Sequence, residues 1–422
     1  MNPTLGLPML TFYGTGMILG AGIYSIIGKA AGETGEGLWL GFLVAAVAAL
    51  LTALSYAELS TMFPKAGAEY VYLTHAFPST PWLGATLGTL MSFAGASTAA
   101  AVAVAFGGYL REFADVPVTL IALAVVASFT LLALAGIRQS GWVTAVSTLI
   151  EAGGLVLVIA LGFMSPTFGE ALAAIPHQGL MTGAALIVFA FFGFENIVSL
   201  AEEAKHPERD LPRAILLSLA IATVLYFFVA LAAVSLMPPA KLAASGAPLM
   251  EATRAGSPRM ATILGAVALF ATANTALISI IGASRVLYGM GDAGAIPKMF
   301  SFVLSKRKTP WLATLVTAGA ALALLPLRQL ETIASVSSFA TLSAFAAINV
   351  ALIRLRFTDH DRRRPFRVPL TIGRWPILPT AAAAMAAALL TQLEARAFYV
   401  GVPLMLVLVA FFMLYARSKR NS

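Results

Sequence analysis

The chain lacks most of the residues with which soluble enzymes build their sites. It contains no cysteine and only four histidines, which lie far apart, and 11% of its 422 residues are charged. A soluble domain carries about 25% charged residues, whereas 59% of this chain is hydrophobic. The missing cysteine excludes disulfides, thiolate metal sites and a catalytic thiol. The composition therefore excludes a water-soluble enzyme, and we expect neither a metal nor an organic cofactor.

Long apolar runs take the place of the missing charges. A helix needs about 20 mostly apolar residues to cross the bilayer. No Lys or Arg precedes Lys29, so we expect no cleaved signal peptide. Residues 64–81, bracketed by Pro64 and Pro78, predict a short interfacial helix or a re-entrant loop. The pattern predicts an all-α integral membrane protein with twelve transmembrane helices, near 8–31, 38–61, 82–110, 117–136, 141–163, 180–201, 211–237, 259–288, 310–326, 331–353, 374–391 and 397–416.

The net charge of +8 is unevenly distributed along the chain. With the N-terminus in the cytoplasm, the inside segments of a twelve-span chain hold 20 of the 27 Lys and Arg residues. Cytoplasmic loops are enriched in basic residues, so we place both termini in the cytoplasm and the chain in the cytoplasmic membrane. The basic segments are explained as topology signals, with anionic lipid as a second role. Nucleic acid is not an expected partner.

Two of the apolar runs carry residues that interrupt a membrane helix. Gly16, Gly20 and Gly22 fall within the first run, and each glycine costs a helix about 1 kcal/mol relative to alanine. Their spacing fits either close helix packing or an unwound segment that faces a cavity. The sixth run contains Gly193 and Glu195, and an ionisable residue at that depth is a candidate functional residue. The alternative for Glu195 is a structural carboxylate that accepts hydrogen bonds from backbone amides freed by the break.

The two interrupted runs stand at matching positions of the chain. The first opens a block of five runs over residues 1–163, and the sixth opens another over 180–354. Interrupted spans at corresponding positions of two halves indicate a transporter site built from inverted repeats. Residues 355–422 hold most of a basic linker, which covers 354–374, and the last two runs. The spacing thus predicts two repeats followed by two peripheral helices.

Five segments, in order along the chain, resemble transporters of the amino acid–polyamine–organocation (APC) superfamily. They are GMILGAGIY at 16–24, YAELSTMFPKAGAEYVY at 56–72, FAFFGFENIVSLAEEAKHPERDLPRAI at 189–215, SRVLYGMGDAGAIPKMF at 284–300 and RPFRVPL at 364–370. The resemblance covers nearly the whole chain. It implies a LeuT-like fold, in which ten core helices form a 5+5 inverted repeat with the first and sixth broken, and two further helices are peripheral. It also implies secondary active transport of amino acids by alternating access.

The chemistry of an amino acid suits a pair of broken helices. Free N–H groups at a helix N-terminus attract a carboxylate, and free carbonyls accept hydrogen bonds from an ammonium. The family's sixth helix often has an aromatic gate, and the resemblance assigns this position to Phe189, for which plain packing is the alternative. The expected substrate-binding residues come from both breaks and one later helix: Met17, Ile18, Gly20, Ala21, Gly22, Ile23, Phe189, Phe192, Gly193, Glu195 and Asn274.

The expected side-chain pocket contains few polar groups. Ser92, Ser97, Thr98 and Asn274 contribute them, and no acidic residue is evident there to select a cationic cargo. This pattern favours a neutral L-amino acid, with a cationic amino acid or a polyamine as the alternative. A receptor that binds an amino acid without moving it is the alternative from another class. A membrane enzyme is not expected, because few ionisable residues lie deep in the spans.

Glu151, ten residues into the fifth run, is the candidate for coupling transport to an ion. Several cationic and proton-coupled members of the family carry a lysine at the corresponding place, and this chain departs from that pattern. No Lys or Arg lies in the inner spans to pair with a charged carboxylate there. We therefore expect Glu151 to bind a proton or to contact a sodium ion, with a structural role as the alternative. Thr275 and Ser279 of the eighth run would line the same region, and amino acid exchange is the alternative to symport.

Overall fold

The computed structural model describes residues 5–421 except 66–67, 137–140, 176–178, 202, 305–306 and 308. Each of the twelve apolar runs is helical. The corresponding elements, in chain order, are α1 (Leu7–Leu19) with α2 (Ala21–Thr34), α3 (Leu38–Met62), α5 (Pro81–Arg111), α6 (Val118–Ala135), α7 (Gly141–Phe163), α9 (Leu180–Ile187) with η2 (Val188–Phe191) and η3 (Phe194–Leu200), α10 (Pro207–Leu236), α13 (Pro258–Asp292), α14 (Trp311–Leu324), α15 (Leu330–Thr358), α16 (Ile377–Leu390) and α17 (Ala395–Asn421).

Nine stretches of the described chain are long and apolar enough to cross a membrane. The number falls below the twelve expected for two reasons. The first two runs are joined through the short helix η1 (Gly35–Gly37) into one stretch, Leu7–Met62, and the helices at Trp311–Leu327 and Ile377–Leu390 are shorter than a standard span. The helices thus fit a multi-pass membrane protein, whereas twelve crossings in inverted repeats stay a prediction.

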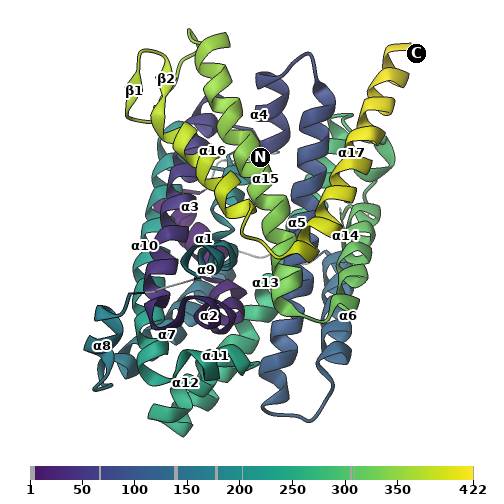
Figure 1. The fold of residues 1–422 in the computed structure, drawn as a ribbon. Helices are drawn as coiled ribbons and strands as arrows, with labels where there is room; N and C mark the ends of the chain where they lie inside the picture. Colours follow the sequence, from purple (N-terminus) through teal and green to yellow (C-terminus); the bar gives the residue numbers. More distant parts are fainter. Residues whose placement is uncertain are drawn as a thin grey trace.

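Short elements cover the two ends of the helix bundle (Figure 1). The helix α4 (Ala68–Ala76), the hairpin of β1 (Thr371–Ile372) and β2 (Trp375–Pro376), and the C-terminal end of α17 lie at one end, which we call the α4 end. The helices α8 (Phe168–Ala173), α11 (Pro239–Ala244) and α12 (Pro248–Gly256) lie at the opposite end. The helix α4 is a short helix within 64–81, and its position at the membrane interface stays a prediction.

Close packing of small residues holds the centre of the bundle together. The long helix α5 packs against α13 and α15, and α10 packs against α3 and α1. At Gly95 of α5, an added Cβ would lie 2.9 Å from the Cβ of Ala283 in α13. Small residues let the backbones of membrane helices approach in this way. The helix α13 has 35 residues and is therefore about 52 Å long, more than the bilayer core requires.

The segment between α15 and α16 is fixed to α3 by a buried ion cluster. The carboxylate of Glu58 in α3 accepts hydrogen bonds from the guanidinium groups of Arg356 and Arg364, and from the backbone N–H of Val368 at 2.8 Å. The side chain of Glu58 is fully buried, and those of both arginines are nearly so. The predicted linker therefore begins later than residue 354, because α15 continues to Thr358 and the following loop is anchored rather than free.

Candidate substrate site between two helix breaks

The first break separates α1 from α2 at Gly20. The backbone there has φ −39° and ψ −153°, outside the helical region. The amide of Gly20 still donates to the carbonyl of Gly16 at 3.2 Å, whereas the amide of Ala21 donates to Oγ1 of Thr275 at 2.8 Å. A side chain at Gly20 would run into the same hydroxyl. Thr275 of α13 therefore caps the new helix and leaves the later amides of its first turn, including Gly22, without acceptors within the helix.

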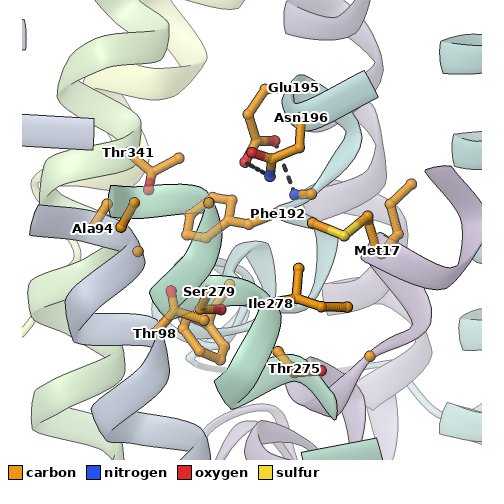
Figure 2. A pocket seen from close by; sticks show the side chains of 18 of the residues that line it. Met17, Ala94, Thr98, Phe192, Glu195, Asn196, Thr275, Ile278, Ser279 and Thr341 are labelled. Atoms are coloured by element: carbon orange, nitrogen blue, oxygen red, sulfur yellow. Dashed lines mark hydrogen bonds between the residues drawn. The ribbon is translucent and has the colours of Figure 1, made fainter. Parts of the chain in front are cut away.

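The second break lies between η2 and η3. Gly193 adopts φ 127°, a conformation that glycine tolerates and other residues rarely adopt. Its amide donates to Oε2 of Glu195 at 2.9 Å, and Nδ2 of Asn196 donates to Oε1 at 3.3 Å (Figure 2). The structural carboxylate considered for Glu195 is thus present, because this side chain binds a backbone amide released by the break. The same side chain also lines the cavity described below.

The two breaks touch each other through backbone atoms. A Cβ added at Gly193 would lie 2.6 Å from the carbonyl oxygen of Met17, and one added at Gly22 would lie 2.6 Å from the Cα of Ala190. Both distances are shorter than a Cβ allows, so these glycines permit the contact. Close packing and an interrupted helix, which the glycine spacing left as alternatives, therefore occur together in this segment.

Tyr226 of α10 joins both breaks from the side. Its hydroxyl oxygen lies 2.6 Å from the carbonyl oxygen of Ile18 and 3.1 Å from that of Ala190. The ring is fully buried, and it packs on Phe42 and Phe191. Tyr226 was not among the predicted site residues. The available signal was a phenol in the middle of the run 211–237, where its hydroxyl needs a partner.

A cavity of about 110 Å³ lies between the breaks and the helices α5 and α13. Figure 2 shows Phe192, Thr98 and Ser279 around this space. Nine of the eleven predicted substrate-binding residues line it, namely Met17, Ile18, Gly20, Ala21, Gly22, Phe189, Phe192, Gly193 and Glu195. Ile23 and Asn274 are not among the lining residues. Thr275 and Ser279, predicted for ion coupling, line the cavity as well.

The two breaks also contribute Gly16, Ala190 and Asn196 to the lining. The rest of the lining comes mainly from α5 and α13 and is mostly apolar: Met91, Ala94, Gly95, Thr98, Val102, Ile278, Gly282, Ala283 and Val286, with Thr341 from α15 and Glu69 from α4. Ser92 and Ser97 lie elsewhere, because their hydroxyls donate to the carbonyls of Ala283 and Phe93. No acidic residue was expected in the side-chain pocket. Glu69 was not predicted because it belongs to a short helix outside the apolar runs.

Glu151 lies beside the first break and outside the cavity lining. Its side chain is fully buried, Oε1 accepts a hydrogen bond from Nδ2 of Asn274 at 3.2 Å, and Oε2 has no hydrogen-bond partner among the described residues. The hydroxyl of Tyr24 in α2 donates to the backbone carbonyl of Glu151 at 3.0 Å. Asn274 therefore faces the Glu151 carboxyl and joins α13 to α7, whereas the bond to α2 is made by the backbone carbonyl of Glu151.

A bundle of long apolar helices with a cavity between two interrupted helices fits a multi-pass membrane transport protein. The family model described as "Amino acid permease" matches residues 5–414. The chain belongs to the amino acid permease family. Because the named relatives are permeases and transporters, the chain is a transport protein and not an enzyme.

Several named proteins are similar to nearly the whole chain. The "Branched-chain amino acid permease BcaP" of Bacillus subtilis is 32% identical over 86% of this chain and 83% of the relative. The "Methylthioribose transporter" of the same species is 28% identical over 88% and 84%. The "Cationic amino acid transporter 3, mitochondrial" of Arabidopsis thaliana is 30% identical over 84% of this chain and 62% of the longer relative. The names of these relatives refer to cargoes of different chemistry.

Proposed function

We propose that the protein is a secondary active transporter of neutral L-amino acids, coupled to protons, in the cytoplasmic membrane with both termini inside. The observation that carries the proposal is the cavity between the two helix breaks. It offers backbone amides at one helix start and backbone carbonyls at one helix end, which are the groups that a zwitterion needs. Family membership supports amino acid cargo, and alternating access would expose the cavity to each side in turn.

The carboxylate of the cargo binds at the start of α2. Thr275 already accepts the hydrogen bond of the Ala21 amide, so the amide of Gly22 in the cavity wall is the free donor of that turn. A helix N-terminus stabilises an anion at this position through its dipole and its free N–H groups. A glycine leaves the backbone open to approach, which explains why the site needs few special side chains.

The ammonium of the cargo binds at the end of α1. The last carbonyls of a helix lack acceptor partners within it. Of these, the carbonyl of Gly16 binds Gly20 and that of Ile18 binds Tyr226, whereas that of Met17 faces Gly193. We assign the ammonium to the carbonyl of Met17, together with that of Phe192 from the second break. Phe189, which is buried and packs edge to face on Phe192, covers the site as the aromatic gate.

The side chain of the cargo lies against α5 and α13. Alanine, glycine, valine, methionine and isoleucine make up most of this wall, which favours an apolar side chain of modest size. The similarity to a protein named as a branched-chain amino acid permease supports the same assignment. A cationic amino acid is the second candidate, because Glu69 and Glu195 line the cavity and because other relatives are named cationic amino acid transporters.

Coupling is assigned to Glu151. Its Oε2 has no hydrogen-bond partner among the described residues, and none of the ion pairs of the described chain includes this carboxyl. A charge buried without a partner is costly, so a proton or a sodium ion must neutralise it. A proton requires no additional ligands, and it is the coupling ion that we propose.

Transport by purified protein in liposomes tests the function. Vesicles are loaded with leucine or left empty, and uptake of labelled leucine is followed with an inward proton gradient, an inward sodium gradient or neither. Concentrative uptake that requires only the proton gradient is the expected result. Uptake that requires leucine inside would identify an exchanger, uptake that follows sodium would identify a sodium symporter, and binding without uptake would identify a receptor.

A further inference from the structure

Glu69 is a buried acid at the edge of the substrate cavity. It belongs to α4, yet only 7% of its surface is exposed, and it lines the same cavity as both helix breaks. The hydroxyl of Tyr56 in α3 donates to Oε1 of Glu69 at 3.0 Å. Tyr56 is itself fully buried, and its ring centroid lies 5.8 Å from that of Phe194 in η3. The position of Glu69 is therefore fixed by the residues that surround the second break.

A second carboxyl, that of Glu195, reaches the same cavity from η3. Glu195 is also 7% exposed and lines the cavity, and it follows Phe194, the ring on which the Glu69 partner Tyr56 packs. None of the ion pairs among the described residues includes Glu69 or Glu195. The described lining of the cavity thus includes two acids and no Lys or Arg.

The other ionisable groups near Glu69 do not supply a cation to the cavity. Tyr72 of α4 packs edge to face on Tyr56, and a phenol carries no positive charge. His75 of α4 binds the carbonyl of Val71 and lies against Phe63. On the packed helices, Arg285 of α13 is exposed and Arg354 of α15 lies over Phe77, and neither lines the cavity.

Burial raises the pKa of the Glu69 carboxyl above its usual range. A buried acid without a cationic partner therefore tends to keep its proton, whereas an ammonium placed beside it favours the charged form. The Glu69 carboxyl can therefore be neutral next to an apolar cargo side chain and negatively charged next to a cationic one.

We propose that Glu69 is the residue that determines whether the transporter accepts a positively charged side chain. This inference rests on the proposed function. In it, the carboxylate and the α-ammonium of the cargo occupy the two helix breaks, and the side chain of the cargo extends toward Glu69 and Glu195. A cationic side chain forms an ion pair with Glu69, and the carboxyl releases its proton. A neutral side chain leaves the proton in place. One cavity therefore serves both kinds of cargo, with Glu69 as the group that changes charge.

Binding of lysine and norleucine to the purified protein tests this role, because the two differ at the end of the side chain by one ammonium. The lysine-to-norleucine affinity ratio should fall at least about tenfold in Glu69→Gln, as expected when one partner of a buried charge pair is removed. In the wild type, this ratio should rise with pH, since protons compete with the ammonium. Glu170→Gln, which changes an exposed acid at the opposite end of the bundle, should leave both affinities unchanged.

A second measurement needs no variant. Calorimetric titrations in buffers of different ionisation enthalpy should show a proton released when lysine binds and none when norleucine binds. The proposal is overturned if lysine fails to compete with norleucine in the wild type, if lysine binds without proton release, or if Glu69→Gln keeps the wild-type ratio. If norleucine binds but one of these three results is found, the proposal for Glu69 fails and the proposed function stands. If no amino acid binds, both the proposed function and the proposal for Glu69 fail.

Discussion

The hydroxyl oxygen of Tyr226 lies 2.6 Å from the carbonyl oxygen of Ile18 and 3.1 Å from that of Ala190, so one side chain contacts both broken helices. Ile18 lies one residue before the end of α1, and Ala190 lies one residue before the end of η2, so the regular hydrogen bonding of each helix ends next to these carbonyls. The single hydroxyl hydrogen of this phenol is therefore shared between two carbonyls, one from each broken helix.

Replacing Tyr226 by phenylalanine should weaken substrate binding about tenfold. The ring and its packing remain, but buried carbonyls lose their donor, at a cost of about 1–3 kcal/mol. Equilibrium binding of leucine to the purified variant measures the effect. Tyr399→Phe removes a hydroxyl from a residue that is 77% exposed and should bind as the wild type does. Unchanged affinity in Tyr226→Phe would show that the hydroxyl does not support the site.

A methyl group at Gly22 should abolish substrate binding while the protein still inserts into the membrane. Its Cβ would lie 2.6 Å from the Cα of Ala190, so the two breaks must separate and the amide of Gly22 must shift. Gly153→Ala is the matched control, because nothing lies within 4 Å of a Cβ added there. Leucine binding and gel filtration of both variants give the readout. Binding at wild-type strength in Gly22→Ala would contradict the assignment.

Glu151→Gln should separate exchange from driven uptake. The amide resembles a protonated carboxyl in shape and can still interact with Asn274, but it cannot release a proton. Exchange of leucine across liposomes should continue, while an inward proton gradient should no longer concentrate it. If the variant still concentrates leucine with acid outside, the proton is carried elsewhere.

The ion cluster at Glu58 should contribute strongly to stability. Removing one partner of a buried ion pair typically costs about 3–5 kcal/mol, because the other charge stays buried and unpaired. Glu58→Gln leaves the buried charges of Arg356 and Arg364 without their carboxylate partner. The variant should unfold at a temperature several degrees lower in detergent, or fail to fold. Arg363→Gln, at an exposed arginine of the same segment, should have little effect. Equal unfolding temperatures for wild type and Glu58→Gln would rule out this contribution.

The natural absence of cysteine makes the membrane orientation directly measurable. Single cysteines introduced at Ile175 and His360, both exposed, have no background thiol to compete for reagent. A membrane-impermeant maleimide should label the cysteine at 175 in intact cells and the one at 360 only after permeabilisation. The reverse pattern would contradict the charge-based topology.

The apolar runs and the glycine positions made the helices and the first break predictable, because both depend on local composition. Glu69 and Tyr226 were not predictable in the same way. Glu69 reaches the cavity from the short helix α4, which lies outside the apolar runs. Tyr226 reaches the breaks only because α10 packs against α1 and α3. Their roles depend on contacts between distant parts of the chain, which residue spacing does not report. Asn274 was predicted at the cavity and instead faces Glu151 for the same reason.

The contact between the two breaks limits which positions can change in evolution when the preferred cargo of the proposed transporter changes. Gly22 meets the main chain of Ala190, and Gly193 meets that of Met17, so the mechanical connection is made of atoms that every residue possesses. Substitutions at wall positions such as Met91 of α5 and Val286 of α13 can reshape the space for a side chain without changing that connection. In the proposed transporter, cargo preference therefore depends mainly on wall positions away from the contact between the breaks, and a change of preference does not require that contact to change.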